Sequence, residues 1–106
     1  MPKYLIKASY TAEGVKGVMK DGGTKRRQAA EAAIKSTGGK LEGFYFAFGD
    51  ADALVIIDAP DNASVAAASM AIGASGLVSC TTVVLLTPEE IDQAVKKGAT
   101  YTPPGR

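Results

Sequence analysis

Three consecutive basic residues, Lys25, Arg26 and Arg27, form the densest cluster of charge in the sequence. We expect them in the first turn of a helix, where each cation opposes the helix dipole at a cost of about 0.3–1 kcal/mol and an anion should compensate it. Arg26 continues the row of Ala30 and Ile34 along one side of that helix. Arg26 and Arg27 are therefore candidate ligand-binding residues for a carboxylate or a phosphate. The alternative is a solvated basic patch whose aliphatic stems cover the helix edge.

Two carboxylates, Asp50 and Asp52, stand close together in a predicted turn. Such a pair can hold a hard cation or share a proton. Turns favour aspartate equally, because its side chain accepts hydrogen bonds from nearby backbone amides. Asp52 is a candidate ligand-binding residue on the first interpretation. No further carboxylate nearby completes a calcium loop, so we expect no metal site.

Tyr45 and Ser9 are candidates for polar contact with a ligand. Tyr45 alternates with Phe44 and Phe46 along a predicted strand, so either the tyrosine or the phenylalanines face the helices. A pocket on the tyrosine side would combine apolar walls with a phenol that donates a hydrogen bond. Ser9, on the first predicted strand, is a weaker case of the same kind.

Missing residue types exclude several classes of chemistry. The chain has no histidine and a single cysteine, Cys80. Ser-His-Asp and Cys-His catalysis, histidine-ligated haem and thiolate clusters are thereby excluded. Cys80 lies within an apolar run and is predicted to be a small buried hydrophobe. We expect no cofactor.

Length and charge narrow the class of protein. A chain of 106 residues is the size of one domain, which we expect to span residues 1–106. The formal net charge of +1 gives no reason to expect nucleic acid or a membrane surface as a partner. No apolar run approaches the roughly 20 residues of a membrane span, and the first residues lack the pattern of a signal peptide. We therefore expect a cytoplasmic protein.

The periodicity of apolar residues predicts the elements that position these candidates. Strands are expected at residues 3–10, 41–49, 53–59 and 77–86, with a hairpin turn at 49–52. Helices are expected at 12–21, from 25 to the Gly38-Gly39 pair, at 63–74 and at 91–97, followed by an extended tail at 99–106. This order predicts an α+β fold of the ferredoxin-like β-α-β-β-α-β type. Its four-stranded antiparallel sheet has helices on one face, and a C-terminal helix follows.

The third and fourth predicted strands lack a polar face. Residues 54–57 and 83–86 are apolar on both sides of the strand. An exposed apolar sheet face is a liability for a monomer, so we expect a second copy of the chain to cover it, as a homodimer or higher oligomer. The alternative is that the last helix folds over this face within one chain. The tail either stays frayed or wraps a neighbour.

Three segments carry a family resemblance: GGKLEGFYFAFG at residues 38–49, PDN at 60–62 and LLTPEE at 85–90. They resemble the GYD domain family, and the similarity covers nearly the whole chain. The family is named for a Gly-x-Tyr-Asp turn, which Gly49 and Asp52 match while Ala51 replaces the tyrosine. The resemblance implies a dimeric α/β barrel type of fold. It implies no particular reaction, because similar folds serve cofactor-free oxygenases, isomerases, haem-handling proteins and ligand-sensing domains.

Two functions from different classes follow from these observations. The first is a homo-oligomeric domain that binds a small anionic or aromatic metabolite, or that serves assembly, without chemistry of its own. The second is a cofactor-independent isomerase or oxygenase in which Arg26 holds the substrate and Tyr45 or an aspartate transfers a proton. A trimeric signalling domain of ferredoxin-like build is a third possibility that differs in symmetry.

Overall fold

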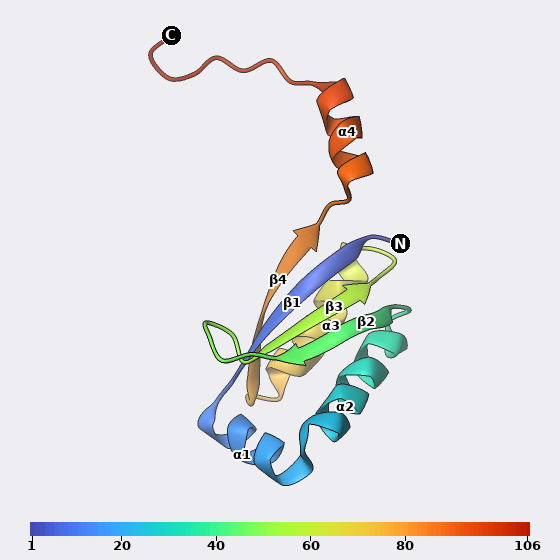
Figure 1. Ribbon diagram of the computed structural model, residues 1–106, viewed down its shortest axis with the longest axis vertical. Coiled ribbons are helices and arrows are strands. Elements are labelled where there is room, and N and C mark those ends of the chain that lie inside the picture. The colour runs from blue at the N-terminus through green and yellow to red at the C-terminus, as the bar shows by residue number, and fades with distance from the viewer.

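The computed structural model describes residues 1–106 and contains four strands and four helices (Figure 1). In chain order these are β1 (Lys3–Tyr10), α1 (Ala12–Asp21), α2 (Gly23–Ser36), β2 (Lys40–Phe46), β3 (Ala53–Asp58), α3 (Asn62–Ala74), β4 (Val78–Leu85) and α4 (Pro88–Lys97). The strands form one antiparallel sheet in the order β2-β3-β1-β4. Helices α2 and α3 lie on the same face of it (Figure 1). The predicted α+β, ferredoxin-like fold is confirmed.

Side-chain caps mark the residues at which α1, α3 and α4 begin. The hydroxyl of Thr11 accepts the N–H of Gly14 at 3.2 Å at the start of α1. Asp61 accepts hydrogen bonds from the hydroxyl of Ser64 at 2.7 Å and from its N–H at 2.8 Å, at the start of α3. These bonds favour the carboxylate and lower the pKa of Asp61 below its ordinary value. Polar caps thus set the helix boundaries that position the core.

Gly22 separates α1 from α2. Its φ of 81° lies in the left-handed region that favours glycine. The predicted break between the helix at 12–21 and the helix that follows is confirmed, although α2 begins at Gly23 and not at residue 25. The two helices consequently run in different directions (Figure 1).

The hydrophobic core lies between the sheet and the pair α2 and α3. Its largest fully buried side chain is Ile57, and the cluster around it consists of Tyr4, Ile6, Ile34, Val55, Ala59, Val65 and Ala68. The hydroxyl of Tyr4 donates a hydrogen bond of 2.6 Å to Oδ1 of Asn62, which joins β1 to the first turn of α3. A buried phenol therefore keeps a polar partner.

Strand register settles which aromatic side chains of β2 face the helices. Phe44 pairs with Val55, whose side chain is in the core, whereas Tyr45 pairs with Leu54. Directly paired residues share a face of the sheet, so Phe44 points toward the helices and Tyr45 points to the opposite face. Tyr45 is 64% exposed.

The second strand is shorter than predicted. It ends at Phe46 and not at Gly49, because Ala47 N–H donates a 2.8 Å hydrogen bond to the carbonyl of Asp52 and closes a longer turn at residues 47–52. Phe48, predicted within this strand, is fully exposed in the turn. The alternation of phenylalanines continues to Phe48, past the last paired residue Phe46, so the sequence pattern does not reveal where the strand ends.

The face of the sheet away from α2 and α3, here called the open face, has no helix over it (Figure 1). Leu5, Leu54 and Ile56 project from it and are only partly buried. At one edge, Lys3 forms ion pairs with Asp58 and Glu42, whose hydrogen bonds raise the pKa of Lys3. Only 12 of the 106 residues are buried in the single chain, so much apolar surface stays uncovered.

Helix α4 stands beyond the end of the sheet and continues the direction of β4 (Figure 1). Every residue from Pro88 to Lys97 is exposed. The last helix therefore does not fold over the open face of its own sheet, which was the intramolecular alternative. None of the four helices is long and apolar enough to cross a membrane.

Candidate functional site

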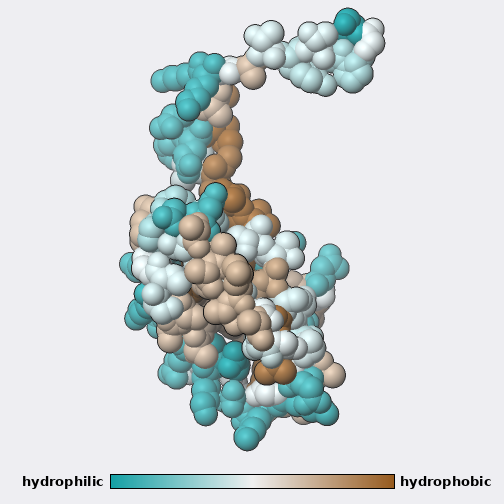
Figure 2. Space-filling model, turned by 180° about the vertical axis from the view of Figure 1, so that it is seen from behind, coloured by the Kyte–Doolittle hydropathy of each residue, from teal (hydrophilic) through white to brown (hydrophobic).

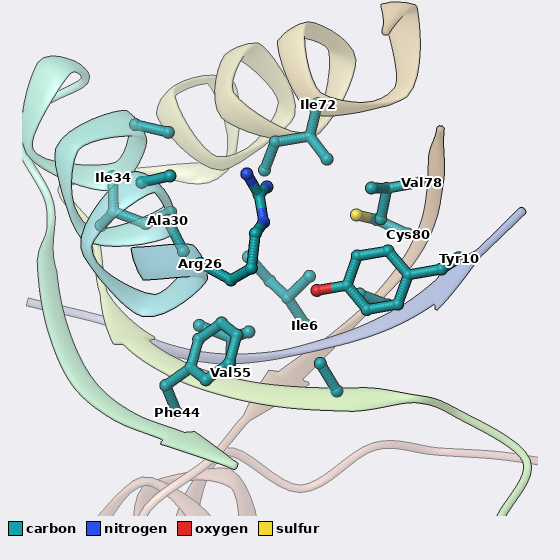
Figure 3. Close-up of a pocket in the computed structure, with 14 residues that line it drawn as sticks. Ile6, Tyr10, Arg26, Ala30, Ile34, Phe44, Val55, Ile72, Val78 and Cys80 are labelled. Atoms are coloured by element: carbon teal, nitrogen blue, oxygen red, sulfur yellow. The ribbon is translucent and has the colours of Figure 1, made fainter. Parts of the chain in front are cut away.

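A cavity of about 90 Å³ lies between α2, α3 and the covered face of the sheet (Figure 3). Fourteen residues line it, and thirteen of them are hydrophobic. They are Ile6, Ala8, Tyr10, Ala29, Ala30, Ala33, Ile34, Phe44, Ala53, Val55, Ile72, Val78 and Cys80, together with Arg26. Arg26 is thus the single charged residue of an apolar cavity.

Small side chains create the space. Ala29, Ala30 and Ala33 of α2 point at the sheet, where Ala8 and Ala53 lie opposite them. No side chain extends beyond Cβ at these positions, so helix and sheet leave a gap that larger residues would fill. Together with Ile34, these alanines of α2 form one wall of the cavity.

The guanidinium of Arg26 has no hydrogen-bond acceptor within the chain. Its nearest carboxylate is Asp21, with Nη1 and Oδ2 at 3.8 Å, which is an ion pair but too long for a hydrogen bond. Asp21 is shared with Lys25, whose Nζ lies 4.0 Å from Oδ1. Asp21 therefore supplies the negative charge expected beside the basic cluster, but at distances too long for hydrogen bonds. Figure 3 shows the guanidinium between α2 and α3, pointing toward Ile72.

Arg26 stands between the inner cavity and a second, outer hollow of about 250 Å³. Asp21 and Ser75 line the outer hollow, and Tyr10 and Val78 border both. A molecule entering from outside would therefore meet the guanidinium before the apolar walls.

The cavity contains two further groups with exchangeable protons. The hydroxyl of Tyr10 points into it, toward the side chain of Arg26 (Figure 3). Burial raises the pKa of the Cys80 thiol, so this sulfur stays protonated at neutral pH and is not an activated nucleophile. The phenol can donate a hydrogen bond to a bound oxygen.

The structure brings only one of the five candidate residues into this cavity, namely Arg26. Arg27 is exposed and borders a separate hollow next to Phe44. Tyr45 and Ser9 lie on the open face of the sheet, on the other side from Arg26. Asp52 accepts the N–H of Tyr10 at 2.8 Å, which is a long-range bond to β1 and not the bond to a nearby turn amide that the turn interpretation predicts.

Tyr10 is the cavity residue that sequence reasoning did not select. It shares a strand face with Tyr4, Ile6 and Ala8, so the alternation already placed it on the same side as the core. Combining that face with the position of Arg26 on the helix would have identified it.

Comparison with known proteins gives a family. No curated protein and no solved structure matches the chain. The family model of the GYD domain matches residues 4–95, from the beginning of β1 into α4. The match includes both walls of the cavity. The chain therefore belongs to the GYD domain family.

Proposed function

We propose that this GYD protein binds a small apolar acid in the cavity between α2, α3 and the sheet, and that Arg26 holds its carboxylate. The observation that carries the proposal is the guanidinium of Arg26, which borders an otherwise apolar cavity and donates no hydrogen bond within the chain. The Arg26 side chain is 34% exposed and its ion pair with Asp21 is too long for a hydrogen bond, so its N–H donors are free for a ligand. A ligand carboxylate can accept two parallel hydrogen bonds from the guanidinium, which Asp21 does not do.

Size and polarity define the ligand. An apolar cavity of about 150 Å³ holds one benzene ring, so a cavity of about 90 Å³ has room for a shorter group of roughly three or four carbon atoms. The walls require this group to be apolar, and the mouth requires one negative charge. Tyr10 can donate a further hydrogen bond to the carboxylate or to a neighbouring oxygen. Short-chain aliphatic monocarboxylates, with the carboxylate at the mouth beside Arg26, meet these conditions.

The position of Tyr45 favours the binding hypothesis over the catalytic one. The isomerase or oxygenase hypothesis combines Arg26 with Tyr45 or an aspartate, and Tyr45 is on the opposite face of the sheet. Binding needs only the groups that the cavity contains.

The experiment compares acids with amides of the same shape. Butyrate and pentanoate are titrated against butyramide and pentanamide by calorimetry, with melting temperature as a second readout. We expect binding of the acids only. Arg26→Gln should weaken it roughly 10- to 100-fold, since a hydrogen bond to a charged group contributes about 1.5–3 kcal/mol.

Two variants serve as controls. Arg27→Gln removes the neighbouring, exposed guanidinium and should leave affinity unchanged. Ala33→Leu fills the cavity and should abolish binding while Arg26 remains. Equal binding of acid and amide, or equal affinity of the Arg26→Gln variant, would overturn the proposal.

We also propose that the protein is a homo-oligomer in which a second copy covers the open face of the sheet. Leu5, Leu54 and Ile56 support this, because they form an apolar centre that no element of the same chain covers. Facing sheets in a two-fold pair would bury these side chains in both copies at once. Ligand binding and self-association are separate proposals, and each can fail alone.

A further inference from the structure

Helix α4 is well formed but packs against nothing in its own chain. The Thr87 hydroxyl accepts the N–H of Glu90 at 3.1 Å, and the Glu90 carboxylate accepts the N–H of Thr87 at 3.0 Å. This capping box stabilises the first turn of the helix. Helices shorter than about 12–15 residues are marginal in water without tertiary contacts. A helix of ten residues therefore needs a surface to pack on.

One side of α4 is apolar. Ile91 and Val95 are four residues apart and share a side of the helix, and Leu86 precedes them at the end of β4. We call these three residues the C-terminal stripe. All three are exposed, and Figure 2 shows apolar side chains along one side of this helix with polar ones on the other. Gln93 lies on the polar side.

A second uncovered apolar surface lies at the other end of the molecule. Val15 and Val18 of α1 and Phe46 and Phe48 at the hairpin line a groove of about 360 Å³, here called the aromatic groove. Phe48 is fully exposed, and Phe46 and Val15 are each 43% exposed. A cluster of exposed aromatic and aliphatic side chains of this kind is typical of a binding surface.

The two surfaces lie at opposite ends of the sheet. In the register of β1, Lys3 pairs with Leu85, next to α4, whereas Ala8 pairs with Ala53, next to the hairpin. Two copies related by a two-fold axis, with their strands antiparallel, would place the α4 end of each beside the hairpin end of the other. The open faces then cover each other, and α4 crosses the end of the second copy's sheet to reach the groove. The groove lies on the side of α1, because Phe46 pairs with the buried Ala53 and shares its face of the sheet.

Charges agree with this pairing. Lys96 and Lys97 are at the end of α4, and Asp50 adjoins Phe48 in the hairpin. None of the three forms an ion pair within the chain. Opposite charges beside two apolar surfaces favour one orientation of docking.

We propose that α4 of each copy docks through the C-terminal stripe into the aromatic groove of a second copy, so that the dimer exchanges its C-terminal helices. The inference rests on the proposed self-association, and it adds that each copy contributes its helix α4 to the surface of the other. Leu86, Ile91 and Val95 would pack against Phe46 and Phe48, and the exposed phenylalanine becomes the centre of the interface.

The first test measures the dissociation constant of the dimer by analytical ultracentrifugation. Val95→Asp and Phe48→Asp should each raise the dissociation constant at least tenfold. The double variant should raise it little further, because each single substitution already removes the same contact between α4 and the aromatic groove. Gln93→Asp adds the same charge on the polar side of α4 and should change it less than twofold. Val95 and Phe48 are exposed in the single chain, so these variants should fold.

The second test uses disulfide formation in a Cys80→Ser chain. A chain that carries both Phe48→Cys and Val95→Cys should oxidise to a covalent dimer, because the hairpin and α4 lie at opposite ends of the sheet and the two cysteines of one copy cannot meet. Phe48→Cys with Gln93→Cys is the control and should stay reduced.

The outcomes of these tests distinguish failure of the helix exchange from failure of self-association. A full-length chain that is monomeric at all concentrations overturns this inference and the proposed self-association together. An oligomer whose dissociation constant is unchanged by Val95→Asp and Phe48→Asp overturns the helix exchange alone. A covalently closed monomer would also overturn it.

Discussion

Asp50 and Asp52 lie in the same turn, but their surroundings differ. Oδ2 of Asp52 accepts the N–H of Tyr10 at 2.8 Å, and the Asp52 N–H donates to the carbonyl of Ala8 at 2.8 Å. Asp50 is exposed and makes no side-chain hydrogen bond. Asp52 therefore joins the hairpin to the end of β1, beside the phenol that borders the cavity.

Removing the two carboxylates one at a time should separate these roles. Asp52→Ala leaves the partly buried N–H of Tyr10 without an acceptor, so we expect a loss of about 1–3 kcal/mol in the free energy of unfolding. Asp50→Ala is the matched control and should stay within about 0.5 kcal/mol of the parent chain. Urea unfolding followed by circular dichroism measures both. A loss for Asp52→Ala no larger than that for Asp50→Ala would contradict the distinct structural role of Asp52.

The residue scale is where sequence reasoning was least complete. It selected Arg26 correctly as the charged member of an apolar helix side, because a spacing of four is visible in the sequence. It left open whether Tyr45 or Phe44 faces the helices, since alternation gives two faces without saying which is covered. Only the pairing of Phe44 with Val55 resolved that choice.

Two glycines of α1 lie three residues apart and face different surroundings. A Cβ on Gly14 would overlap the carbonyl oxygen of Leu77, the same oxygen that accepts the N–H of Thr11 at 2.9 Å. A Cβ on Gly17 would meet nothing within 4 Å. Gly14 thus lets α1 approach the beginning of β4.

Alanine at these two positions should change stability in opposite directions. Gly14→Ala should lower the free energy of unfolding by about 1–3 kcal/mol, because the clash is with backbone that cannot move freely. Gly17→Ala should raise it by up to about 1 kcal/mol, since alanine is a far better helix former than glycine. Thermal and urea unfolding of the two variants provide the measurement. A stabilised Gly14→Ala chain would contradict the close approach of α1 to Leu77.

At the element scale most of the fold was predictable. The first strand, the break at Gly22 and the Thr87 cap follow from alternation, paired glycines and capping residues, all of which are local signals. The end of β2 was not predictable, because Phe48 keeps the apolar alternation after the hydrogen bond at Ala47 has closed the turn. Long-range pairing decides such ends, and no local pattern reports it.

The whole molecule is elongated. Its radius of gyration is 16.8 Å, whereas a compact chain of this length would have roughly 13 Å. The excess comes from α4 and the tail, which extend away from the sheet (Figure 1). An elongated chain with a small core is expected to gain stability when copies associate.

Melting temperature should therefore depend on protein concentration. Raising the concentration one-hundredfold should raise the midpoint by several degrees, since mass action stabilises a folded oligomer. Ile56→Lys places a charge on the open face and should remove this dependence. Ala32→Lys, at an exposed position of α2, is the control and should retain it. Differential scanning calorimetry over that range gives the slope, and a flat line for the parent chain would contradict self-association.

The small core of the single chain has a consequence for the cell. With 12 buried residues, a lone copy keeps little reserve against unfolding, and the association that we propose would supply the rest. The folded fraction then rises with the rate of synthesis, because a higher concentration favours the oligomer. A twofold drop in expression would therefore lower the amount of folded protein more than twofold. Substitutions in α4, far from the cavity, would appear first as reduced abundance through degradation of unassembled chains.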